Sequence, residues 1–535
     1  MEQAPTPTAA GSPVLLGDRG NALLPGEAVL VGSLPKIPLP FAYEVPSVVG
    51  VHRGHRRLDR GSWLRSVALF LYLMENDSSI ERTVRALREQ AAGRELGELM
   101  PSSRTVGAEL GVGPVTVRRA VSQLVAEGVL STRPGVGTFV ARPTRRPVAD
   151  TAWQQVALGA SPVDAGGLDA QRRLRERPDV LQLAAGYPTA GLRPDGRLGA
   201  ALARAGRRPQ AWSAAPPEGI AELRTWFASQ VGVEVEEIVV SSGSQGAISA
   251  AMRALLPSGS PVLFSVPTYP GALAAARSAG LVPVPVPCDE EGAIPELLER
   301  AFATSEARLA YLQPTFANPG GQSLAAGRRD QVLAIAADAG AFLIEDDWAR
   351  WLDHHSPPPP PLIRDDQHGH VINLVSLTKV VAPSLRVGAI AARGPVLRRI
   401  ASMRLLDEFF GPRPLQEAAI DFVTSAGWRS HLRTVSATLR RRVEALTASL
   451  LRHLPDCSFE IPHGGISIWL RLPDGVDDEA VVVAALARGV AVSAGSAFTL
   501  GEQEHRHLRL SFLAIEEGAI EEAVTRLAEA IAEQR

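Results

Sequence analysis

The sequence contains only two cysteines, Cys288 and Cys457, which lie far apart and share no metal-binding motif. This scarcity excludes a disulfide framework and argues against a zinc site, so we expect no bound metal and a reducing compartment, the cytoplasm. The longest apolar run near the N-terminus, residues 67–74, is too short to span a bilayer and lies too deep in the chain for a signal peptide. We therefore expect no membrane association.

Lysine is the second scarce residue, because only Lys36 and Lys379 are lysines among 55 basic side chains. The simplest explanation is a GC-rich coding bias that replaces lysine by arginine wherever only the charge is needed. A lysine that survives this bias is more often one whose amine is required. The net charge is also small. A value of −2 predicts no general affinity for polyanions. Between Glu81 and Arg146, however, eleven arginines face six glutamates, which weakly indicates nucleic-acid binding.

The 535 residues exceed what one ordinary core accommodates, so two or three domains are expected. Residues 1–73 are rich in glycine and proline, and we interpret them as a disordered extension or as an over-long translation start with Met74 as the true first residue. Residues 74–142 are predicted to form a compact helical domain, residues 143–180 a polar, arginine-rich linker, and residues 181–535 a larger second domain.

The first domain has the pattern of a winged helix-turn-helix. Helical spacing and turn residues predict three helices and a two-stranded hairpin, which cover Ile80–Ala91, Ser103–Leu110, residues 114–127, Leu130–Arg133 and Thr138–Ala141. In such a motif the second helix of the helix-turn-helix fits the major groove of DNA. Taken alone, the helix pattern is as compatible with a small helical domain that carries solvated arginines.

The candidate DNA contacts lie at the start of these helices and at the hairpin tip. Thr116, Arg118 and Arg119 follow the N-terminus of the third helix, where side chains face base edges. Arg104 lies at the start of the second helix and is placed to contact a phosphate or a guanine edge. Glycines at the hairpin tip let the backbone approach the sugar-phosphate chain, and these are Gly135 and Gly137.

The second domain alternates short β-branched runs with helices, which predicts a mainly parallel sheet covered by helices on both faces. The predicted strands are Ile238–Ser241, Val262–Ser265, Leu309–Gln313, Ala341–Glu345 and Val371–Val375. The last 90 residues predict a smaller α+β subdomain with strands near Ile466–Leu472 and His507–Phe512. The fold class is therefore α/β with an added N-terminal helical module.

Three features of the second domain suit Schiff-base chemistry, which needs an amine, a phosphate anchor and an acid that faces a pyridine nitrogen. Lys379 directly follows a predicted strand, at the position where α/β folds place ligands. The small-residue turn at residues 241–246 leads into a helix N-terminus, which is a ready anion site. One acid of the segment 345–347 would supply the ring partner. Each feature alone is weak, because such turns and acids are common.

Two resemblances strengthen these hypotheses. The first domain resembles the GntR family of regulators through the pieces Pro101–Arg104, Leu110–Val112, Thr116–Val117 and Gly135–Val140, with Gly113–Pro114 as a departure. From about Leu181 to the C-terminus the chain resembles fold-type I aminotransferases of class I/II. The carrying motifs, in family order, are PTYPG at 267–271, ANPGG at 317–321, IEDDW at 344–348, SLTKVVAPSLRVG at 376–388 and HLRLSF at 507–512. The combination looks like the MocR-type regulators.

This resemblance implies pyridoxal 5'-phosphate as the cofactor, with Lys379 forming the internal aldimine and Asp346 pairing with the pyridine nitrogen. It also implies that Asn318 hydrogen-bonds the ring hydroxyl oxygen, that Tyr269 stacks on the ring, and that Arg509 binds the carboxylate of an amino ligand. The residues implied to hold the phosphate are Ser244, Gln245, Ser376 and Arg386.

Two residues depart from the aminotransferase pattern. Trp348 stands where the family has a tyrosine, and a tryptophan cannot replace a phenol as an acceptor or a proton donor. Ala214 stands where the family has the tyrosine that reaches the phosphate of the partner subunit. These changes predict weak or no transaminase activity, while the groups that hold the cofactor are retained.

We weigh three functions. The first is a transcription regulator that binds double-stranded DNA and senses an amino compound by aldimine exchange at Lys379. The second is a working aminotransferase whose winged helix is incidental or autoregulatory. The third is a structural DNA-binding protein that has lost the cofactor, against which Lys379 argues. The resemblance also implies a homodimer with each winged helix over the other subunit, and hence a two-fold or tandem-repeat operator.

Overall fold

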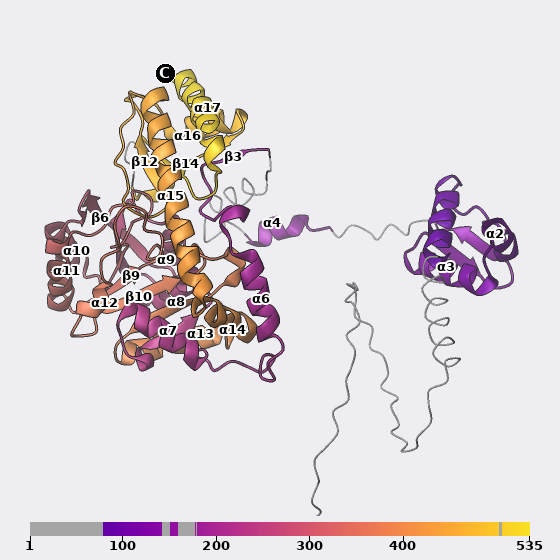
Figure 1. The fold of residues 1–535 in the computed structure, drawn as a ribbon, viewed down its shortest axis with the longest axis horizontal. Helices are drawn as coiled ribbons and strands as arrows, with labels where there is room; N and C mark the ends of the chain where they lie inside the picture. Colours follow the sequence, from indigo (N-terminus) through magenta and orange to yellow (C-terminus); the bar gives the residue numbers. More distant parts are fainter. Residues whose placement is uncertain (1–78, 142–149, 159–176, 178, 502–505) are drawn as a thin grey trace, which may run out of the picture. The chain divides into compact units, whose positions relative to one another are not determined.

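The computed structural model of the chain describes residues 79–141, 150–158, 177, 179–501 and 506–535. The interpretation of residues 1–73 concerns residues outside these ranges. The chain divides into two compact units between Asp150 and Thr151, and each has its own hydrophobic core (Figure 1).

The first unit consists of three helices and an antiparallel hairpin, as the sequence predicts. The helices cover residues 79–92, α2 (Ser103–Leu110) and α3 (Pro114–Ala126), and the strands are β1 (Leu130–Arg133) and β2 (Gly137–Val140). The Ser102 hydroxyl caps α2 by accepting a hydrogen bond of 3.1 Å from the Thr105 N–H, which satisfies one free donor of the first turn. Gly111 ends α2 with a φ of 62°, a conformation that glycine adopts without steric cost.

The core of this unit is built from apolar side chains spaced three and four residues apart on its helices. Val84 and Leu87 of the first helix are buried against Val117 and Leu124 of α3. Val106 of α2 is buried in the same cluster. The three helices therefore form one small core, which fixes α3 and leaves its opposite face exposed.

The second unit is built on an eight-stranded sheet with the strand order β4-β11-β10-β9-β8-β5-β6-β7. Strands β10, β9, β8, β5 and β6 are parallel to one another, and β11 is antiparallel to both of its neighbours. The predicted mainly parallel sheet is confirmed. The strands are β4 (Ile238–Ser241), β5 (Pro261–Val266), β6 (Val282–Asp289), β7 (Gly292–Ala293), β8 (Leu309–Leu312), β9 (Phe342–Asp346), β10 (Val371–Ser376) and β11 (Gly388–Ala392).

Helices cover both faces of this sheet because successive strand residues point to opposite sides. Val240 and Leu343 belong to one core cluster, whereas their neighbours Val239 and Ile344 belong to the other. One face is covered by α8 (Ser244–Leu255), α9 (Pro270–Ser278) and α13 (Pro395–Glu408). The other is covered by α7 (Ala221–Val231), α10 (Pro295–Ser305), α11 (Ala326–Asp338) and α14 (Arg413–Val423). Helix α6 (Asp195–Ala205) packs on α14, and the short α12 (Leu362–Asp365) precedes β10.

Strand β6 was not predicted, because its sequence alternates valine with proline. Its valine N–H groups remain available to β5, as the hydrogen bond of 2.9 Å from Val282 N to the Ser260 carbonyl shows. Over 282–287 the other side of β6 has no paired strand among the described residues, so the missing N–H groups of its prolines cost no ladder hydrogen bond there. Proline is therefore compatible with this edge position.

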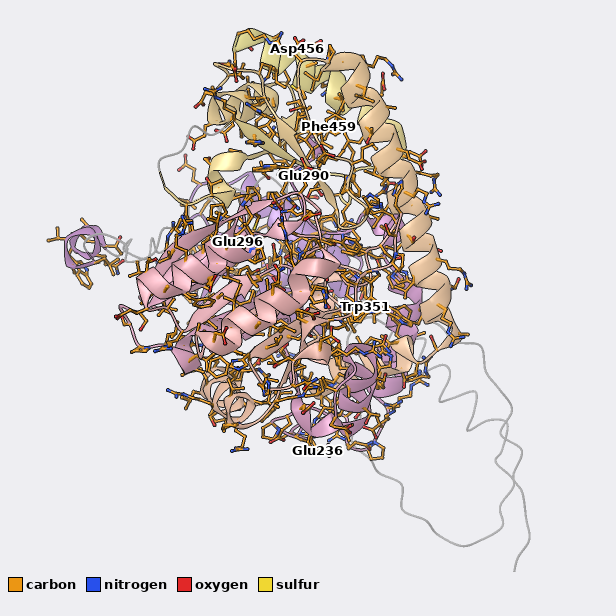
Figure 2. The ribbon with its side chains drawn as sticks, turned by 90° about the vertical axis from the view of Figure 1, so that its left-hand side faces the viewer. Glu236, Glu290, Glu296, Trp351, Asp456 and Phe459 are labelled. Carbon is orange, nitrogen blue, oxygen red and sulfur yellow. The ribbon has the colours of Figure 1, made fainter. Side chains whose placement is uncertain are left out.

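A smaller subdomain follows the long helix α15 (Ala426–His453), which runs along the unit (Figure 2). Asp456 and Phe459, just after α15, lie at the end of the unit opposite to Glu236 (Figure 2). The subdomain contains the antiparallel sheet β12-β15-β14 and the parallel pair β13-β3. Its elements are β3 (Leu181–Gln182), β12 (Ser467–Arg471), α16 (Asp478–Ala487), β13 (Val490–Ala491), β14 (Ser493–Ala494), β15 (His507–Ser511) and α17 (Ile520–Glu533).

The segment predicted as linker, residues 143–180, contains one helix where it is described. This helix is α4 (Ala152–Leu158), and its apolar side chains Trp153, Val156 and Leu158 are exposed. The linker prediction is therefore incomplete, because the sequence AWQQVAL has helical propensity of its own. Among the described helices, none combines the length and the apolar character needed to cross a membrane.

Candidate cofactor site and nucleic-acid interface

The candidate cofactor site lies where several parallel strands of the large sheet end. Strands β4, β8, β9 and β10 run in one direction, so the residues that follow them meet at one edge of the sheet. A cavity of about 430 Å³ opens at this edge. All nine residues predicted for cofactor and ligand line it, namely Ser244, Gln245, Tyr269, Asn318, Asp346, Ser376, Lys379, Arg386 and Arg509.

Lys379 is positioned three residues beyond the end of β10. Its Nζ donates a hydrogen bond of 2.9 Å to the carbonyl oxygen of Gly186 and lies 3.9 Å from the centroid of the Tyr187 ring. The amine therefore reaches into the cavity, as covalent attachment to a ligand carbonyl carbon requires. Neither Gly186 nor Tyr187 was predicted as a site residue.

Asp346, the last residue of β9, is the buried acid of the cavity and is only 2% exposed. Its Oδ2 accepts hydrogen bonds of 2.6 Å from the Tyr311 hydroxyl and 3.2 Å from the Gln313 side-chain amide. Its Oδ1 has no partner among the described residues. Burial raises the pKa of Asp346 to about 6, and the two hydrogen bonds limit this rise. A buried carboxylate with an unpartnered oxygen is stabilised by a cationic partner such as a protonated pyridine nitrogen.

The turn between β4 and α8 forms a cradle for an anion. Gly243 has a φ of 95°, and a side chain there would come within 3.0–3.1 Å of the Arg386 guanidinium. Ser244 begins α8, and its buried hydroxyl has no partner within the described chain. The helix N-terminus and the guanidinium thus face the same space, which suits a phosphate group. Ser376 is buried beside it, with its hydroxyl donating to the Thr378 hydroxyl at 2.9 Å.

Gln313 connects Asp346 to the Asn318 backbone, and the sequence analysis did not assign it a role. Its amide donates to Asp346, and its Oε1 accepts a hydrogen bond of 3.0 Å from the Asn318 backbone N–H. The Asn318 Oδ1 is buried and has no partner among the described residues. Tyr269 is largely removed from water, which raises the pKa of its hydroxyl above the usual range. Gln313 ends the predicted strand 309–313, and this position at a strand end was the signal in the sequence that could have identified it as a site residue.

Arg509 on β15 supplies a buried cation to the same cavity. Its Nη1 donates a hydrogen bond of 3.1 Å to the Ala184 carbonyl oxygen, and its Nε has no partner in the described ranges. Burial lowers the pKa of Arg509 to about 10, so the guanidinium remains charged at neutral pH. No carboxylate of the described residues pairs with it. A buried guanidinium without an anion is suited to the carboxylate of a ligand.

These observations test whether the residues fit pyridoxal phosphate, and they do. An amine, a buried acid with an orphaned oxygen, an anion cradle and an aromatic ring line one cavity. Trp348 also lines this cavity, and its indole N–H has no partner among the described residues. Ala214 is exposed and does not line the cavity. In the described chain, no group of three or more His, Cys, Asp or Glu side chains is arranged to hold a metal ion.

The predicted DNA contacts divide into two groups in the first unit. Arg104, Arg118 and Arg119 are exposed, and within the described residues none of them has an ion pair or a side-chain hydrogen bond. Arg88 and Arg94, by contrast, are neutralised by glutamates. The three unpaired arginines are therefore free to meet phosphates or base edges.

The structure places Thr116 differently from its predicted role. Thr116 is only 9% exposed, whereas Val115 beside it is 51% exposed. Thr116 and Val117 both fall on the buried face of α3, because they lie four and three residues before the buried Ala120. At the hairpin tip, Gly135 and Gly137 both have positive φ values, as a tight turn requires.

Comparisons with known proteins agree with this division. Residues 178–527 match the family model for aminotransferase class I and II, and residues 81–140 match the model for bacterial regulatory proteins of the gntR family. The 2-aminoadipate transaminase of Thermus thermophilus is 31% identical over 386 residues, which cover 71% of this chain and 97% of that protein. The HTH-type transcriptional regulator YdfD of Bacillus subtilis is 27% identical over 429 residues, which cover 78% of this chain and 88% of YdfD.

Among solved structures, LysN, the alpha-aminoadipate aminotransferase of Thermus thermophilus complexed with N-(5'-phosphopyridoxyl)-L-leucine, superposes with a TM-score of 0.67 at 30% identity. The superposition covers 72% of this chain and 99% of LysN. The chain therefore belongs to the aminotransferase class I and II family and carries a gntR-type winged helix ahead of that domain.

Proposed function

We propose that this protein is a DNA-binding transcription regulator whose aminotransferase-like domain holds pyridoxal phosphate and senses an amino compound at Lys379. Pyridoxal phosphate is the cofactor that the class I and II family match indicates. The observation that carries the proposal is the pairing, in one chain, of an intact cofactor cavity with a winged helix whose leading arginines are unpaired. The similarity to the HTH-type transcriptional regulator YdfD supports it.

The residues of the cavity have separate roles in this proposal. The cofactor supplies an electrophilic carbon and an electron-withdrawing ring when it is bound. Lys379 offers the amine that attaches it, Asp346 faces its ring nitrogen, and Arg386 with the N-terminus of α8 holds its phosphate. Arg509 binds the carboxylate of the amino compound, so we propose an α-amino acid or a close analogue as the effector.

Trp348 favours sensing over turnover. Its side chain occupies the cavity wall two residues after Asp346, and an indole cannot exchange a proton with the ligand as a phenol can. The protein can therefore hold an amino compound while it lacks one proton-exchanging group, the phenol, that would assist a transamination cycle. The residual alternative is a working aminotransferase, for which Lys379, Asp346 and Arg509 are all present.

We also propose that the protein is a cytoplasmic homodimer. At the end of α13, Phe409 is 70% exposed and Leu406 is 78% exposed, and large exposed apolar side chains are typical of association surfaces. The thiols of Cys288 and Cys457 are free, which suits a reducing compartment. A dimer would present two winged helices, as a two-fold or tandem-repeat operator requires.

The test is an absorbance spectrum of the purified full chain with pyridoxal phosphate, taken before and after adding a panel of amino acids, with Lys379→Ala as the control. We expect a band that needs Lys379 and that one class of amino acid shifts persistently. A band that converts completely and recovers with a keto acid would make this protein an enzyme instead. The absence of any Lys379-dependent band would contradict the cofactor assignment.

A further inference from the structure

The segment that enters the cavity from β3 is held by donors along its whole length. Four successive backbone carbonyls each accept a hydrogen bond. The donors to residues 183, 184, 185 and 186 are, in this order, Ser511 N at 2.6 Å, Arg509 Nη1 at 3.1 Å, Ser511 Oγ at 2.7 Å and Lys379 Nζ at 2.9 Å. The first three come from β15, and the last comes from the lysine itself. Lys379 is therefore the final anchor of this segment.

The surroundings of the Lys379 amine are suited to an ammonium group. The Gly186 carbonyl oxygen accepts from it, and the face of the Tyr187 ring lies 3.9 Å away, at cation–π distance. A side chain at position 186 would lie 3.4 Å from Nζ and 3.6 Å from Nη2 of Arg509. These are ordinary van der Waals distances, so the approach of the amine to the carbonyl does not depend on glycine at this position.

We propose that the Gly186 carbonyl and the Tyr187 ring form a holding site for the Lys379 amine when it is not bonded to the cofactor. The inference rests on the proposed function, in which an amino compound replaces the lysine on the cofactor carbon. In that exchange the C=N bond to Lys379 breaks and a C=N bond to the incoming amine forms. The two hydrogens of that amine end on the lysine nitrogen, so the exchange needs no oxidant or reductant.

The holding site stabilises only one side of this exchange. A lysine bonded to the cofactor is no longer an ammonium group, so it does not gain from the carbonyl and the ring in the same way. The contact therefore favours the ligand-bound state, which is the differential interaction that a sensor needs. Segment 183–187 also directly follows β3, the first strand after the predicted linker 143–180, so the contact forms near the start of the domain.

The test compares Tyr187→Leu, which removes the ring face, with Tyr187→Phe, which keeps it. Full-length protein loaded with pyridoxal phosphate is titrated with methylamine, and the shift of the cofactor absorbance gives the affinity. Methylamine has no carboxylate, so Arg509 does not contribute. We expect Tyr187→Leu to bind methylamine about tenfold more weakly than the wild type, while Tyr187→Phe stays close to the wild type.

A second readout separates holding from a merely structural role. Tyr187→Leu should retain pyridoxal phosphate as well as the wild type or better. Without the holding site, the state in which Lys379 is not bonded to the cofactor is less stable, so it competes less with the bonded state. If Tyr187→Leu binds methylamine like the wild type, or loses methylamine and cofactor together, the proposal is wrong. If DNA binding ignores amino compounds but methylamine exchange depends on Tyr187, the sensor function fails and the holding site stands.

A cofactor-free experiment uses the scarcity of lysine. The chain has only Lys36 and Lys379, so acetylation by acetic anhydride can be followed at Lys379 with Lys36 as the internal reference. The reagent needs a free amine, and the holding site keeps the amine hydrogen-bonded to Gly186 and against the Tyr187 ring. We expect Lys379 to react several-fold faster in Tyr187→Leu than in the wild type or in Tyr187→Phe. Equal rates in all three proteins would overturn the proposal.

Discussion

The Tyr311 hydroxyl donates a hydrogen bond of 2.6 Å to the carboxylate of Asp346, and both side chains are buried at the ends of neighbouring strands. Burial raises the pKa of Asp346 from 3.8 to about 6, although this hydrogen bond opposes the rise. The protein thus keeps an ionisable acid where its charge is costly unless a cation is bound. Buried acids with raised pKa values are concentrated at functional sites.

Asp346→Asn should stabilise the cofactor-free protein and weaken its cofactor binding. A raised pKa means that the folded state disfavours the charged carboxylate. The resulting loss of folding free energy is absent below pH 3.8, grows between pH 3.8 and about 6, and is complete above that. Removing the charge should raise the free energy of unfolding by about 1–3 kcal/mol at pH 8. The gain should be smaller at pH 5. Urea denaturation at both pH values measures it, and equal gains would contradict the assigned cause.

Gly243→Ala should damage the phosphate cradle. The φ of 95° and ψ of 168° at Gly243 are nearly forbidden to other residues, and the new methyl group would crowd the Arg386 guanidinium. Relaxation of this strain, about 1–3 kcal/mol, would move the turn away from the conformation that faces the phosphate, so we expect about a five- to hundredfold loss of affinity for pyridoxal phosphate in equilibrium dialysis.

Gly246→Ala is the matched control for this change. Gly246 lies within α8, and a methyl group there meets no atom within 4 Å. Alanine should stabilise the helix by up to about 1 kcal/mol and leave cofactor affinity unchanged. If both variants lose the cofactor equally, the cradle is not specifically built by Gly243 and Arg386.

Arg118→Ala and Arg119→Ala should each weaken DNA binding. Both side chains are exposed and unpaired within the described chain, so they are available to phosphates or bases. For a phosphate contact, the slope of log affinity against log salt should fall by about 1, which fluorescence anisotropy at several salt concentrations measures. Arg88→Ala, which removes an arginine already neutralised by Glu127, should change the slope little. A larger effect of Arg88→Ala would place the DNA on another face.

Trp348→Tyr should raise transaminase turnover. The phenol restores a group that can exchange a proton at the cavity wall, and positioned acid–base groups contribute about 10²–10⁴-fold to such steps. We expect a gain of at least tenfold in single-turnover conversion of amino acid and cofactor, followed by absorbance. Trp348→Phe lacks the hydroxyl and should show no gain. A wild-type protein that already turns over rapidly would contradict the regulatory role assigned to Trp348.

Site residues at strand ends were predicted from the sequence more successfully than site residues that come from a distant part of the chain. Lys379, Asp346 and Asn318 follow or end strands, and parallel strands deliver such residues to one edge. Gly186 and Tyr187 escaped notice because the hydrogen bond that joins Gly186 to Lys379 spans 193 residues and depends on how β3 joins the small subdomain. No local pattern carries that information.

Two other differences have local physical causes. Strand β6 was missed because its prolines argue against a strand until the sheet order shows it at an edge. Thr116 was predicted to face DNA because it lies near the helix start, yet it shares the buried face of α3 with Ala120 and Leu124. The segment was identified correctly, but which of its side chains face outward depends on packing.

The most direct test of the account is the affinity of the full-length, pyridoxal-phosphate-loaded protein for its operator, selected from genomic fragments, with and without each amino acid that shifts the cofactor spectrum. The account predicts a change of at least about fivefold, the lower range of allosteric coupling, and the loss of this change in Lys379→Ala. An affinity that no amino acid changes, in a protein that binds both the operator and the cofactor, would contradict it.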